Sequence, residues 1–259
     1  MNVFGIHRNR INPVFGTCMR SYKTNNSEVH LKKNVLTTTF LFRADLEWGK
    51  LFRYIEENLS FNHSKINTYC LASSDGSEAY SYAMTVLDRA LPQERSKYLP
   101  VMASDIDEEM VMACKSGKIN LTGIDFQSIA NNLLFSKSYF KDAGDEIEIE
   151  NNRPFQEANV DYRSYRPIKE LGDGVVFEKA DILEKVKSIK DEGNSVILCR
   201  NVFMYLQQNY IIRLVSELGK VLKQGSLFVI GDCDSSLGVK NFLNIAGFQE
   251  VMKNVFKRL

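Results

Sequence analysis

The sequence has few of the residues that build metal centres and disulfide frameworks. Its five cysteines are far apart, odd in number and never in CxxC spacing; they are Cys18, Cys70, Cys114, Cys199 and Cys233. This pattern argues against a disulfide framework and against a zinc site. The three histidines, His7, His30 and His63, are too scattered for an HExxH-type metal site. We therefore expect free thiols and no metal.

Long apolar runs and an excess of one charge are also missing. No stretch approaches the ~20 apolar residues that a membrane-spanning helix needs. The segment from Met1 to Arg20 lacks the apolar core of a signal peptide. The net charge is +1, so the chain is not a polycation for nucleic acid. These absences predict a cytoplasmic protein with no membrane insertion and no nucleic-acid partner.

The length of 259 residues, with 44% apolar and 25% charged residues, fits one large α/β domain with a small appendage. Residues 1–35 are predicted to form a short basic arm with one short helix. Within the first 33 residues a single acid, Glu28, stands against six bases: Arg8, Arg10, Arg20, Lys23, Lys32 and Lys33. The main domain is then expected over residues 36–259.

Apolar runs alternate with helical patterns through this main domain. Strands are predicted at 67–72, 101–104, 175–177, 195–199 and 226–231, and helices at 77–90, 107–116 and 207–222. Asp45 is placed to cap an earlier helix, whose buried stripe comprises Trp48, Leu51, Phe52, Ile55 and Leu59. The alternation predicts an α/β fold with a doubly wound, mostly parallel sheet.

Residues 139–174 interrupt this rhythm. The run Glu146–Glu150 alternates charged and apolar residues with a period of two, as a half-exposed strand does. The stretch Asn151–Pro154 has the composition of a turn. We therefore predict a small antiparallel β insertion at about 139–174.

Polar residues follow the predicted strands, where a doubly wound sheet binds its ligands. Small residues from Ala72 to Ser77 lead into a helix, so the backbone there can approach a ligand closely. Asp105 is predicted to accept hydrogen bonds from ribose hydroxyls, and Asp107 to cap the next helix. Asp181 is either an acceptor for an adenine amino group or a solvated loop acid. The missing GxGxxG fingerprint argues against a nicotinamide oxidoreductase.

The most informative stretch is Cys199–Leu206, with the sequence Cys-Arg-Asn-Val-Phe-Met-Tyr-Leu. Together with Asp75–Ser81 and Ala103–Asp107, it resembles the signature segments of CheR-type chemoreceptor glutamate methyltransferases, in matching order and spacing. The Thr39-x-x-Phe-Arg43 element resembles a further segment just upstream of that family's fold. The resemblance runs from about Leu36 to about Asp234.

The resemblance implies a Rossmann-like class I methyltransferase fold that uses S-adenosylmethionine and releases S-adenosylhomocysteine. It also implies methyl transfer to glutamate side chains of receptor helices, as in chemotaxis adaptation. Arg43 and Tyr205 would lie near the reacting methyl group as catalytic residues. The residues implied around the cofactor are Thr39, Ala72, Glu78, Asp105, Asp181, Ile182, Asn201 and Val202. The insertion stands where the family has a small β-subdomain that docks a receptor tail peptide in some members.

The sequence departs from the family pattern at several positions. Ser77 and Ala79 replace the first Glu and the Pro of the usual Gly-Glu-Glu-Pro-Tyr-Ser, and the segment before residue 36 is far shorter than the helical receptor-contacting domain of typical members. Further differences are Thr37 for Asn, Leu41 for Phe, and Asp232-Cys233-Asp234 for His-Ser-Glu. Two alternatives therefore stay open: a methyltransferase of the same fold with another protein or small-molecule acceptor, and a non-catalytic module that binds S-adenosylmethionine or a peptide.

Overall fold

The structure is a computed structural model that describes residues 39–59, 63–135, 137–144, 163–235 and 238–259, together with the backbone of 18–20 and 35–37. Two of the predicted features, the short helix of the basic arm and the alternating run Glu146–Glu150, lie outside these residues. The backbone segments β1 (Cys18–Arg20) and β2 (Val35–Thr37) pair antiparallel with each other.

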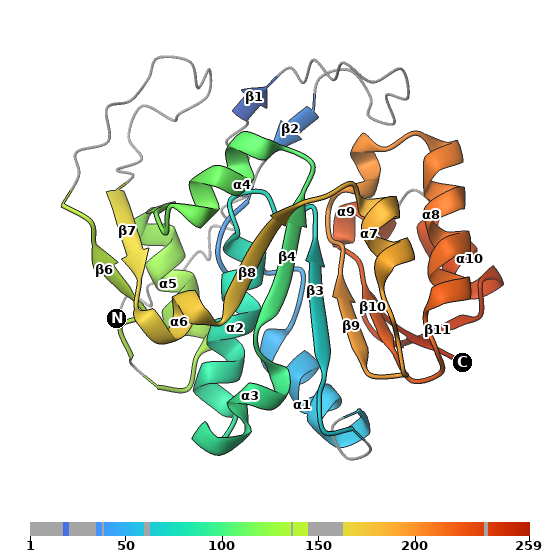
Figure 1. Cartoon of the computed structure of the whole chain (residues 1–259), viewed down its shortest axis with the longest axis horizontal. Helices are drawn as coiled ribbons and strands as arrows, with labels where there is room; N and C mark the ends of the chain where they lie inside the picture. The colour runs from blue at the N-terminus through green and yellow to red at the C-terminus, as the bar shows by residue number, and fades with distance from the viewer. Residues whose placement is uncertain are drawn as a thin grey trace, which may run out of the picture.

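A seven-stranded sheet forms the centre of the molecule (Figure 1). Its strand order is β11 (Phe248–Met252), β12 (Val255–Arg258), β10 (Leu227–Val229), β9 (Ser195–Leu198), β3 (Asn67–Leu71), β4 (Val101–Asp105) and β8 (Val175–Lys179). The strands from β10 to β8 are parallel, whereas β12 runs antiparallel to both of its neighbours. The predicted doubly wound, mostly parallel sheet is confirmed. Since the chain order reverses between β3 and β9, the sheet has a switch point there, where such folds bind ligands.

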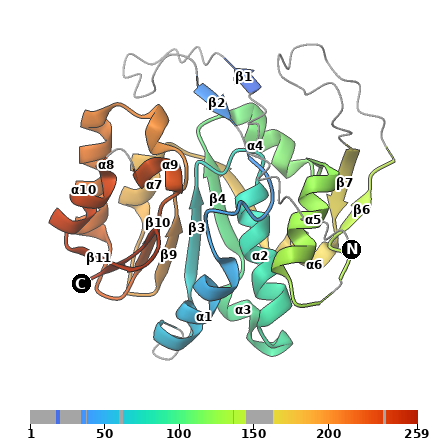
Figure 2. The same ribbon diagram turned by 180° about the vertical axis from the view of Figure 1, so that it is seen from behind.

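Helices cover both faces of this sheet (Figures 1 and 2). One face carries α1 (Trp48–Asn58), α2 (Ser77–Arg89) and α4 (Glu108–Lys115), and the other α7 (Ile182–Ser188), α8 (Gln208–Val221) and α10 (Val239–Ile245). Strand β9 explains this arrangement: Val196 and Leu198 belong to the first core cluster, while Ile197 belongs to the second. Alternate side chains of a strand point to opposite faces, so a fully buried apolar strand requires a helical layer on each.

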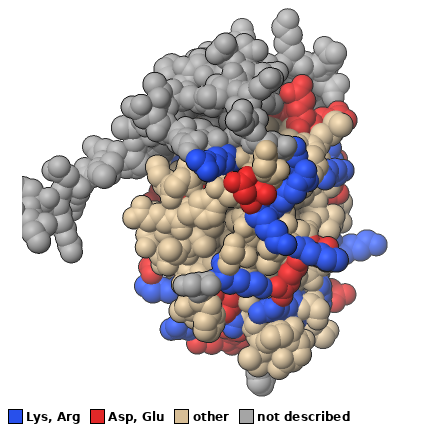
Figure 3. All heavy atoms as spheres, turned by 90° about the vertical axis from the view of Figure 1, so that its left-hand side faces the viewer, with Lys and Arg blue, Asp and Glu red and all other residues tan. Residues whose placement is uncertain are grey.

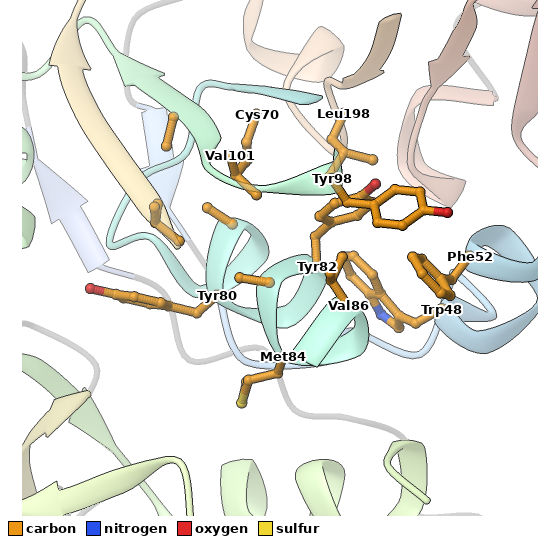
Figure 4. Close-up of a cluster of buried hydrophobic side chains, with 14 of the residues drawn as sticks. Trp48, Phe52, Cys70, Tyr80, Tyr82, Met84, Val86, Tyr98, Val101 and Leu198 are labelled. Atoms are coloured by element: carbon orange, nitrogen blue, oxygen red, sulfur yellow. The ribbon is translucent and has the colours of Figure 1, made fainter. Parts of the chain in front are cut away.

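The predicted apolar stripe of α1 is buried against the sheet (Figure 4). The rings of Phe42 and Trp48 pack edge to face with centroids 5.9 Å apart, and those of Phe52 and Tyr98 lie 5.1 Å apart. Tyr98 ends a short connection made of η1 (Pro92–Glu94) and α3 (Arg95–Tyr98). These aromatic contacts join the segment before α1 to α1, and α1 to α3.

A small antiparallel sheet with the order β5-β7-β6 stands beside the main sheet. It comprises β5 (Ile119–Leu121), β6 (Phe140–Asp142) and β7 (Arg163–Pro167), with α5 (Gly123–Asn132) and α6 (Lys169–Asp173) nearby. Two of these strands lie in the predicted insertion, and β5 precedes it. Figure 3 views this side, where acidic and basic side chains are interspersed, as in the ion pairs of Glu170 with Arg95 and Lys137. No helix in the described part of the chain is both long and apolar enough to span a bilayer.

Candidate functional site

The turn after β3 has an unusual backbone that opens the N-terminus of α2. Ala72, Ser74 and Gly76 have positive φ angles of 55°, 50° and 85°. A side chain at Gly76 would place its Cβ 2.8 Å from the Phe177 ring, so both the conformation and the space favour glycine there. The Asp75 carboxylate accepts the Ser77 N–H at 2.9 Å, while the N-cap residue Gly76 has no side chain to cap α2, so the N-terminus of α2 is presented at the switch point of the sheet.

Asp105 ends the neighbouring strand β4 and is 9% exposed. One carboxylate oxygen accepts the Ser74 N–H at 2.7 Å, and the other accepts the Asp107 N–H at 2.9 Å. Burial raises the pKa of Asp105, while these backbone donors act in the opposite direction. Each carboxylate oxygen can accept more than one hydrogen bond, so Asp105 retains acceptor capacity for a ligand. The predicted cap is confirmed: Asp107 accepts the N–H groups of Glu109 and Met110.

A buried ionic network lies behind the α2 N-terminus. The Arg200 side chain is fully buried; it donates to Glu78 at 3.0 Å, forms a short ion pair with Asp45, and stacks over the Trp48 ring at 5.1 Å. Burial raises the pKa of Glu78 despite the opposing effect of Arg200. The network joins the segment before α1, the start of α2 and the loop after β9, so it fixes three loops around one edge of the sheet.

Asp45 does not have the capping role expected for it. The N-cap of α1 is Glu47, which makes no side-chain cap. Besides pairing with Arg200, the Asp45 carboxylate accepts the Asn201 side-chain amide at 3.0 Å and the Asp232 N–H at 3.1 Å. Those partners lie more than 150 positions away along the chain, so local sequence carries no signal for them.

The loops after β9 and β10 interlock at Asn201 and Asp234. Asn201 has a φ of 56°. A Cβ built on Gly231 would lie 2.2 Å from the Asn201 Oδ1 atom, so the Asn201 side chain fills the space that a side chain at position 231 would need. Asp234 accepts three backbone N–H groups: Asn201 at 2.5 Å, Gly231 at 2.9 Å and Phe203 at 3.0 Å. Burial raises the Asp234 pKa to about 6. The sequence marks Asp234 only as a departure from the family pattern and does not predict this loop-bridging role, because its partners lie up to 33 positions away.

Arg43 and Tyr205 lie within electrostatic range of each other. Tyr205 ends the short 3-10 helix η2 (Phe203–Tyr205), one turn before α8 begins. Burial raises the pKa of the Tyr205 hydroxyl, and the nearby Arg43 charge acts against that rise. The Arg43 guanidinium also stands over the Phe40 ring at 5.7 Å. A cation therefore acts on a half-buried hydroxyl that lies four residues after Asn201 in the chain.

The other predicted site residues are Asp181, Ile182, Val202 and Thr39. Asp181 caps α7 through the N–H groups of Leu183 and Glu184 and also accepts the Tyr210 hydroxyl at 2.9 Å. The adjacent Ala180 N–H donates to the Asp105 carbonyl at 2.9 Å, which brings Asp181 next to the β4 end. The remaining predicted residues are Ile182 at the start of α7, Val202 at the start of η2, and Thr39, half-buried before α1.

A family model described as the CheR methyltransferase S-adenosylmethionine-binding domain matches residues 37–252. The chain belongs to the CheR methyltransferase family. The cofactor of this CheR-family domain is S-adenosylmethionine.

Known relatives agree with this assignment. The chain is 24% identical to chemotaxis protein methyltransferase 1 of Vibrio cholerae over 213 residues, which cover 78% of this chain and 66% of the relative. It is 25% identical to a probable chemotaxis protein methyltransferase of Rhizobium etli, covering 72% of this chain and 68% of the relative. The chain thus spans about two thirds of the length of these relatives.

Solved structures give looser matches. A TehB-like S-adenosylmethionine-dependent methyltransferase from Corynebacterium glutamicum aligns with a TM-score of 0.39 at 9% identity, covering 82% of this chain and 84% of that one. An S-adenosylmethionine-dependent methyltransferase from Archaeoglobus fulgidus aligns with a TM-score of 0.38 at 15% identity, covering 78% of this chain and 68% of that one.

The residues at the CheR-family edge fit S-adenosylmethionine. Three buried hydroxyls, on Ser73, Ser74 and Ser104, have no hydrogen-bond partner among the described residues. They lie in the β3 turn and at the end of β4, beside the α2 N-terminus. A buried polar atom without a partner costs free energy, which a polar ligand recovers. An amino acid carboxylate suits the helix N-terminus and ribose hydroxyls suit Asp105.

The Asp105→Ala change is expected to weaken binding of S-adenosylhomocysteine by about 1.5–3 kcal/mol, the range for hydrogen bonds to a charged group. Calorimetric titration measures this directly. Asp142→Ala is the matched control, since Asp142 is exposed on β6. Unchanged affinity in a folded Asp105 variant would exclude a ribose contact.

Proposed function

We propose that the chain transfers a methyl group from S-adenosylmethionine to a glutamate side-chain carboxylate of a chemoreceptor, in the cytoplasm. The observation that carries the proposal is the match of residues 37–252 to the CheR methyltransferase domain, a span in which Arg43 and Tyr205 lie within electrostatic range of each other. An arginine guanidinium is suited to a carboxylate because its planar donors match the two oxygens. The relatives named chemotaxis protein methyltransferases support this acceptor class.

Methylation of a carboxylate requires no proton transfer to or from the protein. A glutamate with a pKa of about 4.3 is already an anion at neutral pH, so it needs no general base. Of the three histidines, only His63 is described, and it lies beside Gly193 at the opposite edge of the sheet. S-adenosylmethionine supplies an electrophilic methyl group on a positively charged sulfur. With it bound, the carboxylate would take the methyl from the sulfur and both would lose their charge, so the transfer would require no proton to be moved by the protein.

The residues of the chain therefore act by positioning. We infer that Arg43 orients the incoming carboxylate, and that Tyr205 donates its hydroxyl to the same group or lines the path of the methyl. The aromatic face of Phe40 limits how far the guanidinium swings, because the cation lies over the ring. Alignment of the reacting atoms and exclusion of water are the main sources of rate enhancement for such a step.

We also propose that the small β5-β7-β6 sheet, which contains strands of the insertion at about 139–174, docks the substrate. The proposed domain division is a basic arm over residues 1–35 and a methyltransferase domain over residues 36–259. Chemoreceptor cytoplasmic helices are the proposed partner. The experiment that tests the function is transfer of labelled methyl from S-adenosylmethionine into a receptor signalling fragment. Base-labile label in the receptor identifies a carboxylate ester, and label on another acceptor or no transfer at all contradicts the proposal.

Arg43→Ala and Tyr205→Phe are each expected to lower the methyl-transfer rate at least tenfold while cofactor affinity changes less than twofold, an effect of about 1.4 kcal/mol or more on the transition state alone. Rates with the receptor fragment and calorimetric affinities for S-adenosylhomocysteine give the two quantities. Arg213→Ala, on the exposed side of α8, is the control. Parallel losses in affinity and rate would assign both residues to cofactor binding, and full activity would remove them from the mechanism.

A further inference from the structure

A cavity of about 490 Å³ lies between the start of α1, the end of α2 and α5, on the face seen in Figure 2. None of Glu78, Asp105, Asn201 or Tyr205 lines it. It is therefore separate from the edge that binds the cofactor. Its volume falls within the range of about 300–1,000 Å³ that is usual for small-molecule pockets.

The walls of this cavity carry an excess of positive charge. Lys50, Arg53 and Arg89 line it, and Glu47 is the one acid among the lining residues. Glu47 is already paired with Lys50 at 2.7 Å, which leaves the two arginines. Glu56 interacts electrostatically with both arginines but does not line the cavity. An anion within the cavity would meet two guanidinium groups and one neutralised lysine.

The N-terminus of α1 opens into the same cavity. Glu47, Trp48, Gly49 and Lys50 form its first turn and all line the space, and no side chain caps the helix. The N–H groups of Lys50 and Leu51 bond to the Glu47 carbonyl at 3.0 Å. The positive end of the helix dipole therefore points at the cavity without an anionic cap.

Arg89 lies directly against this positive helix end. A Cβ built on Gly49 would stand 2.6 Å from the Arg89 Nη2 atom, so the guanidinium occupies the space that a side chain would fill. Nη2 donates to the Asn132 carbonyl at 3.2 Å, while the buried Nε has no partner among the described residues. The Arg89 guanidinium and the positive end of α1 both favour an anion in the cavity.

Glu47 is the one acid that lines this cavity, and Glu56 acts on both arginines from outside it. The first 33 residues contain one acid against six bases, so that segment is a poor source of a counter-anion. The amide of Asn131 and the hydroxyl of Ser128 add uncharged polar groups on the α5 side. Guanidinium groups, backbone N–H groups and amides are together the donors that recognise carboxylate and phosphate oxygens.

We propose that this cavity binds a small organic anion that bears a carboxylate or a phosphate group, held by Arg53, Arg89 and the positive end of the α1 dipole. Ala44 and Leu46 also line the cavity, and they alternate with Arg43 and Asp45. An occupant therefore touches the segment that carries the proposed acceptor-binding arginine. Anion binding at this cavity does not depend on methyl transfer.

The test uses Trp48, the single tryptophan of the chain, which lines the cavity and serves as a fluorescent reporter. The full chain is titrated with citrate and with inorganic phosphate at constant ionic strength, and with glycerol as an uncharged probe. We expect a saturable change with at least one of the two anions and none with glycerol. Comparing the two anions distinguishes a carboxylate headgroup from a phosphate one. Saturation is expected to persist with S-adenosylhomocysteine present in excess.

The variants decide whether the cavity holds the anion. Arg53→Gln and Gly49→Ala are each expected to raise the dissociation constant at least fivefold, the first by removing a cation and the second by displacing Arg89. Arg213→Gln, the same type of change on the opposite face of the sheet, is expected to leave it unchanged. A linear response to both anions, equal binding in all three variants, or loss of binding when S-adenosylhomocysteine is added would overturn the proposal.

Discussion

Replacing Arg200 by methionine is expected to lower the free energy of unfolding by about 3–5 kcal/mol, the cost of leaving buried charges without their partner. The Arg200 side chain is 0% exposed, and the carboxylates of Asp45 and Glu78 that it neutralises are 10% and 16% exposed. The loss of one cation therefore leaves two acids close together in a poorly solvated place. Urea unfolding with an unchanged m-value measures the effect.

Two further variants separate the charge effect from simple loss of packing. In the Arg200→Met background, Asp45→Asn together with Glu78→Gln is expected to restore at least half of the lost stability, because no unpaired charge then remains. Arg213→Met on the exposed side of α8 is the matched control and is expected to change the stability by less than about 0.5 kcal/mol. If the triple variant were no more stable than Arg200→Met, the cost would lie in packing on Trp48 and not in charge.

Binding of S-adenosylhomocysteine is expected to weaken about tenfold between pH 7 and pH 5, as Asp234 gains a proton. The ionised Asp234 accepts N–H groups from Asn201, Phe203 and Gly231, and so holds the loops after β9 and β10 together. Since burial raises its pKa to about 6, protonation removes acceptor capacity within this interval. Calorimetry across the pH range gives the profile.

Protonation of Asp234 has the opposite effect on the free energy of unfolding, and comparing the two pH dependences provides the control. The folded-state pKa of about 6 lies above the ordinary value of 3.8, so the proton is bound more tightly in the folded protein. Its stabilising contribution, about 3 kcal/mol at most, is complete below pH ~4 and disappears as the pH rises through ~6. Asp234→Asn is expected to remove both dependences. A wild-type pH profile retained in that variant would point to Glu78 or Asp105 instead, whose pKa values are also raised by burial.

Much of the fold was predictable because the signals are local. The buried strands β3, β4 and β9 are short apolar runs, and α2 and α8 follow as helical patterns of the expected length. The strand β5 and the helix α5 were not predicted. Three residues are too few to show an alternating pattern, and α5 has only one buried residue, Asp125. Its capping box at Thr122 and Asp125 was the one sequence signal for its start.

The site was predictable only as far as residues follow strands directly. Asp105 and Asn201 stand where the carboxyl ends of β4 and β9 put them, and sequence order alone locates those ends. The partners of Arg200 and Asp234 come from distant loops, and no periodicity encodes such pairings. Asp45 is the clearest example, because an acid shortly before a helix is ordinarily its N-cap, whereas Asp45 pairs with the distant Arg200.

The ion pair of Asp45 with Arg200 closes a chain loop of 155 positions, and that of Glu78 with Arg200 one of 122. Contacts over such separations raise the contact order and carry the entropy cost of closing a long chain loop. We therefore expect the charge network of the cofactor edge to assemble late in folding, when the segment before α1 reaches the loop after β9. A nascent chain that has not yet produced residue 200 has no part of this charge network.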